Sequence, residues 1–148
     1  NEYRRSCRLL KVCVVGDSDS GKSDLIEGLI SGRKAGRQEN PKPRCLWTNS
    51  RLLILRETRG KHASDLAVMA SGWESDWAML TVDAVVGLNA VAKRLLFLLA
   101  LSGVPQLAVV VTRLRVADDP EETYSGLLKE INHLLTSTSQ LNLTVVIP

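Results

Sequence analysis

Short apolar runs and amphipathic stretches alternate along the 148 residues of the chain. An apolar run rich in β-branched residues is typical of a buried strand, and apolar residues three and four positions apart are typical of a helix. The predicted strands cover 9–15, 77–82, 107–111 and 143–147, and the predicted helices cover 21–30, 64–69, 88–101 and 121–135. Two more strand-like runs, 45–48 and 51–56, flank Asn49-Ser50, which fits a tight hairpin turn.

The predicted order is therefore strand, helix, hairpin, helix, strand, helix, strand, helix, strand. Such alternation indicates an α/β fold with a mostly parallel sheet of about six strands and helices on both faces. The chain contains no internal repeat and no linker long enough to divide it. We therefore expect residues 1–148 to form a single domain.

Composition narrows the class of protein. Hydrophobic residues make up 45% of the chain and charged residues 24%, which supports a packed core and excludes a disordered chain. No apolar stretch reaches the roughly 18 residues that a membrane span needs, and no secretory signal pattern is present. Cys13 lies in an apolar run, which indicates a buried thiol in a reducing compartment. We expect a soluble, cytoplasmic protein without a membrane partner.

The net charge of +3 is too small to indicate nucleic acid by itself. Part of the basic charge falls in residues 31–44, which contain no large apolar side chain and read as a loop. This loop is either a solvated connection or a basic contact for an anionic partner. Trp47 and Trp73 are either half-buried packing residues or parts of a protein-binding surface, whereas Trp77 is expected to pack in the core.

One motif carries most of the candidate chemistry. Residues 16–23, GDSDSGKS, fit the pattern G-x-x-x-x-G-K-[ST], between a buried strand and an amphipathic helix. In such a loop the backbone N–H groups point at phosphate oxygens, and the helix N-terminus favours an anion. The predicted phosphate-binding residues are Asp17, Ser18, Asp19, Ser20, Gly21, Lys22 and Ser23. We expect Lys22 to reach the β- and γ-phosphates, and the Ser23 hydroxyl to bind Mg²⁺.

Residues 11–30 resemble the start of the translational GTPases. The resemblance is to the branch of elongation factor Tu and elongation factor 1-alpha, with the selenocysteine elongation factor and the GTPase subunit of ATP sulfurylase as near relatives. Asp19 falls on the aspartate of the family's G-x-x-D-[SH]-G-K-[ST]. Residues 57–61, Glu-Thr-Arg-Gly-Lys, stand where the family has Asp-Thr-Pro-Gly-His, and residues 112–115, Thr-Arg-Leu-Arg, stand where it has Asn-Lys-x-Asp.

The resemblance covers almost all of the chain except residues 31–44. It implies a P-loop GTPase fold and a site for GTP, GDP or another nucleoside phosphate with Mg²⁺. It also implies a protein partner, or RNA or the ribosome. The last predicted strand ends before the loop that contacts the base in the family. Either the chain is a fragment of a longer protein or this last contact with the base is absent, and we expect residues 1–148 to lack that loop and the family's two β-barrel domains.

The predicted base site departs from the family. The family's aspartate accepts hydrogen bonds from guanine, whereas Arg115 carries only donors and cannot replace it. Thr112 is a smaller change, because the selenocysteine factors often have threonine there. Arg113 can still lay its aliphatic stem along a base. Guanine selectivity is therefore expected to be weakened or lost.

The catalytic and metal positions also depart from the family. Glu57 replaces an aspartate that holds Mg²⁺ through water, and its longer side chain can still serve as a metal ligand. Gly60, which senses the γ-phosphate in the family, is kept. Lys61 replaces the histidine that positions the attacking water, and a lysine has only donors. Thr48 is predicted at the hairpin tip, so it does not supply the threonine of the family's first switch.

We interpret the chain as a pseudo-GTPase, a G domain with an intact phosphate loop and degraded base and catalytic motifs. Hydrolysis is expected to be slow or absent, because the lost groups normally contribute orders of magnitude in rate. Contacts with a protein or a ribonucleoprotein would then carry its function. The alternatives are a slow NTPase with relaxed base specificity, and a structural interaction domain that binds no nucleotide.

Overall fold

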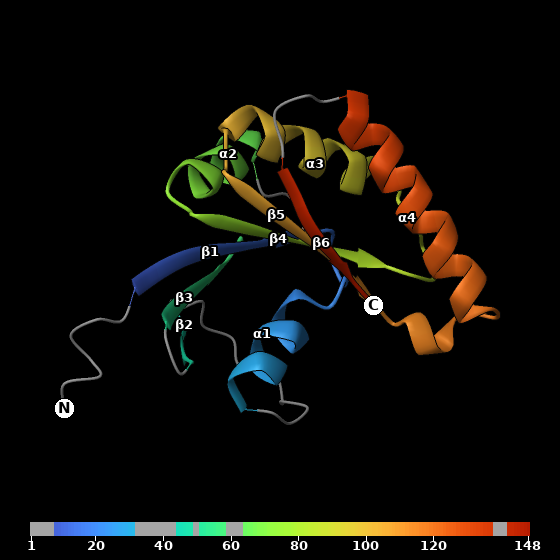
Figure 1. Ribbon diagram of the computed structural model, residues 1–148, viewed down its shortest axis with the longest axis horizontal. Helices are drawn as coiled ribbons and strands as arrows, with labels where there is room; N and C mark the ends of the chain where they lie inside the picture. The colour runs from blue at the N-terminus through green and yellow to red at the C-terminus, as the bar shows by residue number, and fades with distance from the viewer. Residues whose placement is uncertain (1–7, 32–43, 49–50, 59–63, 138–141) are drawn as a thin grey trace.

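A six-stranded sheet forms the centre of the fold, with helices on both of its faces (Figure 1). The computed structural model describes residues 8–31, 44–48, 51–58, 64–137 and 142–148. In chain order the elements are β1 (Arg8–Gly16), α1 (Lys22–Ser31), β2 (Arg44–Trp47), β3 (Arg51–Glu57), α2 (Asp65–Trp73), β4 (Trp77–Asp83), α3 (Ala90–Ser102), β5 (Gln106–Thr112), the short 3-10 helix η2 (Leu114–Val116), α4 (Pro120–Ser137) and β6 (Asn142–Ile147).

The strand order in the sheet is β2-β3-β1-β4-β5-β6. β2 pairs with β3 in the antiparallel direction, and the other neighbouring strands are parallel. The predicted α/β fold and the predicted order of elements are confirmed. The hairpin strands are confirmed as well, while the turn residues 49–50 lie outside the described part of the chain.

The observed helices differ from the predicted ones mainly at their ends. α2 continues four residues beyond the predicted end, because Val68 and Gly72 both face the core. Three of the described helices begin after a side-chain cap: Ser64 accepts a hydrogen bond from Ala67 N, Asn89 accepts one from Ala92 N, and Asp119 accepts hydrogen bonds from Glu121 N and Glu122 N. None of the described helices is long and apolar enough to span a membrane.

The sheet separates two apolar clusters. One face of β1, β4 and β5 packs against α2, α3 and α4, and Cys13 lies fully buried on this side. The opposite face packs Val12, Val14 and Leu55 against Ile26 of α1. Strands that are buried on both faces read as continuous apolar runs, which is why β1, β4 and β5 were predictable from sequence.

The parallel strands bring their carboxyl ends to one edge of the sheet. β1 ends at Gly16, β3 at Glu57, β4 at Asp83 and β5 at Thr112. In open α/β sheets this edge is where ligands bind, in the crevice between neighbouring strand ends. The fold therefore gathers the predicted loop, metal and base positions at a single edge.

The packing of α2 against α3 depends on Gly72. A Cβ atom at Gly72 would lie 2.1 Å from Ser102 Oγ and 2.6 Å from Ser102 Cβ. We expect Gly72→Ala to lower the free energy of unfolding by about 1–3 kcal/mol, because a buried clash outweighs the better helix propensity of alanine.

Gly126 provides the matched control, since it also lies in a helix but a Cβ there would meet nothing within 4 Å. Gly126→Ala should raise the free energy of unfolding by up to about 1 kcal/mol. Urea denaturation measures both variants, and an equal effect of the two would contradict the close approach at Gly72.

Candidate functional site

The loop between β1 and α1 has a backbone that only small residues permit at its two ends. A Cβ atom at Gly16 would lie 2.0 Å from Thr81 Oγ1 and 2.5 Å from Ser20 Oγ. Gly21 has a φ angle of +82°, in the left-handed region that favours glycine, and Asp19 has a φ angle of 60°. These two glycines are those of the predicted phosphate-binding motif.

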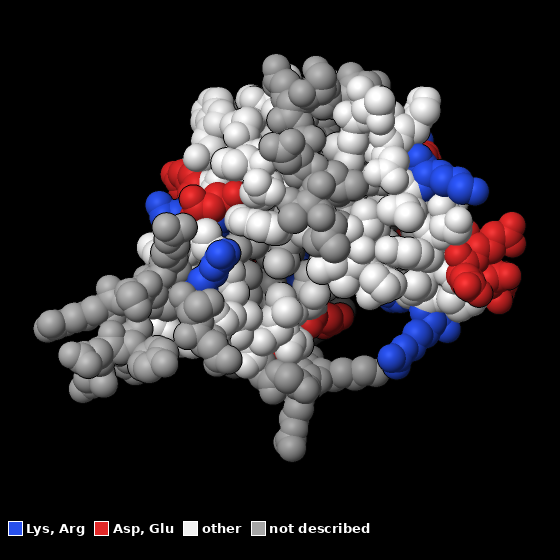
Figure 2. Space-filling model, viewed as in Figure 1, with Lys and Arg blue, Asp and Glu red and all other residues white. Residues whose placement is uncertain are grey.

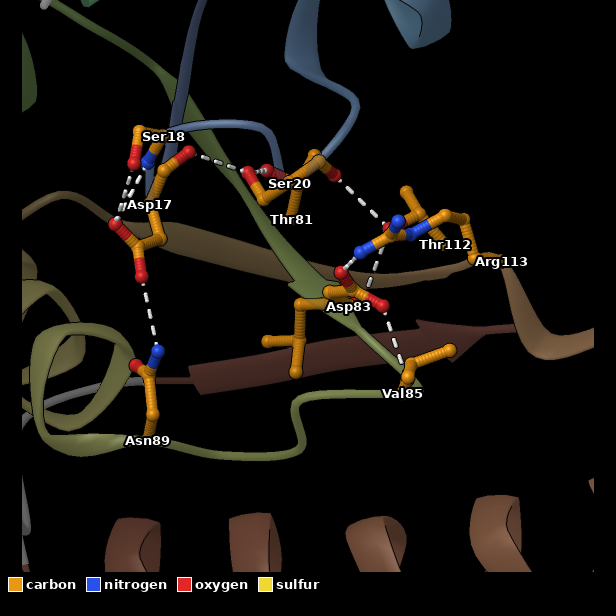
Figure 3. A network of polar contacts seen from close by, with 10 residues as sticks. Asp17, Ser18, Ser20, Thr81, Asp83, Val85, Asn89, Thr112 and Arg113 are labelled. Carbon is orange, nitrogen blue, oxygen red and sulfur yellow. Dashed lines mark hydrogen bonds and ion pairs between the residues drawn. The ribbon is translucent and has the colours of Figure 1, made fainter. Parts of the chain in front are cut away.

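Three neighbouring elements hold this loop in place (Figure 3). The hydroxyls of Ser20 and Thr81, from β4, are 2.7 Å apart and share a hydrogen bond. Asn89, at the start of α3, donates from Nδ2 to Asp17 Oδ2 at 2.9 Å. Thr112, at the end of β5, donates from Oγ1 to the Ser20 carbonyl at 2.9 Å. The loop is therefore fixed by side chains that lie far from it in sequence.

Lys22 lies folded over the loop. Its Nζ donates to the carbonyl of Gly16 at 3.0 Å and to the carbonyl of Asp17. The residue is buried, and this burial lowers the pKa of its amine below the usual lysine value of 10.5, while the negative charges of Glu57, Asp17 and Asp19 act in the opposite direction. A desolvated cation above a ring of backbone groups is suited to bind an anion.

The two predicted metal-binding side chains are in direct contact. Ser23 donates from Oγ to Glu57 Oε1 at 2.9 Å, so the longer side chain of the glutamate does reach the loop. Within the described residues, no three His, Cys, Asp or Glu side chains form a group that could hold a metal alone. Mg²⁺ commonly binds one or two protein oxygens and takes its other ligands from phosphate and water. The pair therefore fits a magnesium ion that arrives with a nucleotide.

A pocket of about 790 Å³ opens beside the loop. Its lining comes from the loop and the start of α1, from the end of β3 and from the end of β5. The lining residues are Ser18, Asp19, Gly21, Lys22, Ser23, Asp24, Leu25, Glu57, Val110, Val111, Thr112 and Arg113. The predicted phosphate, metal and base positions thus meet in one cavity.

Some of the predicted site residues lie elsewhere. Asp17 and Ser20 line a small neighbouring cavity, where they support the loop from behind. Arg115 is exposed in η2 and lines neither cavity. Gly60 and Lys61 fall outside the described residues.

No protein-family model matches the chain, but curated proteins and solved structures do. Sulfate adenylyltransferase subunit 1 of Salmonella paratyphi B is 30% identical over 118 residues, which are 79% of this chain and 24% of that protein. The subunit 1 of Colwellia psychrerythraea is 29% identical over 114 residues, which are 76% of this chain and 24% of that protein. The chain therefore spans about a quarter of the length of these curated relatives.

Solved structures show the same relationship at the level of the fold. Translation elongation factor SelB from Methanococcus maripaludis, in its apo form, aligns with a TM-score of 0.80 at 23% identity over 97% of this chain and 31% of that chain. Its complex with the GTP analogue GppNHp aligns with a TM-score of 0.74 at 16% identity over 96% of this chain and 30% of that chain. The chain has the α/β P-loop GTPase fold and resembles the translational GTPases.

In this GTPase-type domain, the first residues after β5 form a contact that the sequence did not indicate. Arg113 has a left-handed backbone with a φ angle of 56°, and its guanidinium forms an ion pair with Asp83 Oδ2. Asp83 is 7% exposed, and its Oδ1 accepts a hydrogen bond from Val85 N at 2.9 Å. Asp83 directly follows the predicted strand 77–82, which was the available signal, but its partner directly follows another strand.

The hydroxyl of Thr112 connects the end of β5 to the loop, and Thr112→Val removes it with little change in shape. We expect this variant to lose about 1 kcal/mol of unfolding free energy, because the Ser20 carbonyl loses its donor. Thr136→Val is the control, since that hydroxyl bonds only to Asn132 O of its own exposed helix turn. An equal loss in both variants, measured by urea denaturation, would refute a special role for Thr112.

The lowered pKa of Lys22 predicts how the unfolding free energy of the domain depends on pH. Between that lowered pKa and about 10.5 the unfolded chain binds more protons than the folded one, so the unfolding free energy rises with pH. Lys22→Met removes this group. Relative to Lys22→Met, the wild-type domain should therefore gain stability as the pH rises through that range. A constant difference between the two proteins from pH 7 to about 10.5 would contradict the burial of a charged lysine.

Proposed function

We propose that this domain binds nucleoside di- or triphosphates together with Mg²⁺, with weak preference for the base and with little or no hydrolysis. The observation that carries this proposal is the single pocket that Lys22, the Ser23–Glu57 pair and Arg113 all line. A phosphate cradle, a metal position and a base position at one edge of a parallel sheet fit a nucleotide of this kind.

The phosphate end of the pocket has the residues that a nucleotide requires. The Lys22 amine, which donates to the carbonyls of Gly16 and Asp17, would exchange these carbonyls for phosphate oxygens. Ser23 and Glu57 would hold Mg²⁺, which supplies charge neutralisation for the phosphates when it is bound. Gly16 lets the loop approach Thr81 closely, and Gly21 permits its left-handed backbone.

The base end supports the proposal of weak base selectivity. Arg113 lines the pocket, and Arg115, the residue in the slot of the family's aspartate, is exposed and offers donors only. Of the residues that line the pocket, the carboxylates are Asp19, Asp24 and Glu57, which come from the loop, α1 and β3. Arg113, the pocket residue that follows β5, is a cation. Adenine and guanine nucleotides should therefore bind with similar affinity.

Slow or absent hydrolysis is the part of the proposal that rests on Lys61. A lysine at the position of the family's histidine cannot accept a proton from water. The alternative function is a slow NTPase with relaxed base specificity, which would hydrolyse the bound nucleotide.

Exposed apolar side chains support a role through protein contacts. Trp73 and Leu66 of α2 are 63% and 70% exposed, and Phe97 and Leu101 of the neighbouring α3 are 55% and 51% exposed. Large exposed apolar side chains of this kind are common at protein interfaces. On the face drawn in Figure 2, the charged side chains of the described residues have both signs and form no continuous basic stripe. The exposed apolar side chains therefore support a protein partner, and RNA or the ribosome, which the likeness to elongation factors suggests, is the alternative.

Calorimetric titration with GTP, GDP, ATP and ADP in the presence of Mg²⁺ tests the proposal. We expect binding of all four, with less than about tenfold difference between adenine and guanine forms, and no measurable phosphate release over many minutes. Lys22→Ala should abolish binding, because it removes the buried cation. Lys129→Ala, an exposed lysine on α4, should leave binding unchanged.

Each other result has a clear meaning. Binding to none of the four nucleotides would overturn the proposal and favour a structural interaction domain. Steady phosphate release that Lys22→Ala abolishes would favour the slow NTPase. Binding that survives Lys22→Ala would place the nucleotide outside the phosphate loop.

A further inference from the structure

We infer that Asp83 is a positioning residue for nucleotide binding, which holds the Arg113 guanidinium so that its flat face forms the wall against which a base stacks. This inference rests on the proposed function and deepens it. The Asp83–Arg113 pair gives the base end of the pocket its affinity, and it does so without contacting any edge of the base.

The pair spans the ends of two neighbouring strands. Asp83 is the last residue of β4 and pairs in register with Thr112, the last residue of β5. Ala84 N donates to Thr112 O at 2.9 Å, which closes the gap between the two strand ends. Arg113 follows Thr112 directly, so its side chain can turn back over the strand ends toward Asp83, as Figure 3 shows.

The two oxygens of the Asp83 carboxylate contact the segments that follow β4 and β5. Its Oδ1 accepts the hydrogen bond from Val85 N, and its Oδ2 faces the guanidinium. The residue is 7% exposed, whereas the Arg113 side chain is 52% exposed. A buried anion that is fixed by its own backbone turn therefore anchors a cation that remains open to the pocket.

The backbone of Arg113 is also unusual. A φ angle of 56° in a residue other than glycine is uncommon and costs free energy. Such conformations persist where surrounding contacts hold them, and they gather at ligand sites. At Arg113, Val116 N donates to the backbone carbonyl at 3.0 Å, and the ion pair with Asp83 holds the side chain.

The geometry of an arginine side chain explains what the pair offers a ligand. The guanidinium is planar, and Asp83 bonds to an N–H group at its edge, which leaves its two faces for stacking. A cation that stacks on an aromatic ring attracts it through the ring face. Every nucleobase has such a face, so this wall would bind adenine and guanine alike.

Affinities for MgATP, MgGTP and inorganic tripolyphosphate, measured for the wild-type chain and Asp83→Asn, test the inference. Asp83→Asn keeps an acceptor for Val85 N and removes the charge that holds Arg113. We expect it to weaken the binding of both nucleotides about fivefold and to leave tripolyphosphate unchanged, because tripolyphosphate has no base. Glu130→Gln, which loses an ion pair with Lys93 between α3 and α4, should change none of the three.

The remaining outcomes are equally decisive. An equal loss for tripolyphosphate would show that Asp83 only supports the phosphate loop, and no loss for any ligand would show that the pair does not contribute; either overturns the inference. A wild-type chain that binds tripolyphosphate as tightly as the nucleotides overturns this inference alone. A wild-type chain that binds none of the three overturns the proposed function with it. If Asp83→Asn melts at a much lower temperature, Arg113→Gln breaks the same pair from its exposed partner and should give the same pattern.

Discussion

The fit between Gly16 and the end of β4 is the constraint on which the site depends. The Thr81 hydroxyl occupies the space where any other residue at position 16 would place its Cβ, and the same hydroxyl bonds to Ser20. The loop can therefore lie close against the sheet only because its first residue has no side chain. With the loop in that position, Lys22 can reach back over it and Thr112 can bond to it from β5. The phosphate cradle is thus a property of three strand ends as much as of one motif.

The sequence predicted the fold well because its strongest patterns are local. β1, β4 and β5 are buried on both faces, so their apolar runs were unmistakable. The start of α4 is also local, since Asp119 accepts hydrogen bonds from Glu121 N and Glu122 N. The order of the strands within the sheet was not predicted, because local patterns do not show which strands pair. The end of α2 was predicted too early, because it depends on packing against another helix, which the local sequence pattern does not show.

The site was predictable to the extent that it is a motif. Residues 18–23 line the pocket, apart from Ser20, and the Ser23–Glu57 contact is the one that the two predicted metal positions required. The roles of Thr81, Asp83 and Asn89 were not predictable, because each acts through a partner more than 25 residues away. Arg115 illustrates the converse: its place in a motif suggested a contact with the base, but the turn of η2 exposes it. Motif spacing therefore identifies the ligand-facing residues better than the residues that orient them.

Asn89 serves two structures with one side chain. Its Oδ1 accepts the hydrogen bond from Ala92 N that starts α3, while its Nδ2 donates to Asp17 in the loop. A loop that moved away from α3 would have to carry the first turn of that helix with it or leave the helix start without its cap. The exposed side chains of Phe97 and Leu101 belong to the same helix, α3. One amide side chain therefore ties the position of the loop to the first turn of α3.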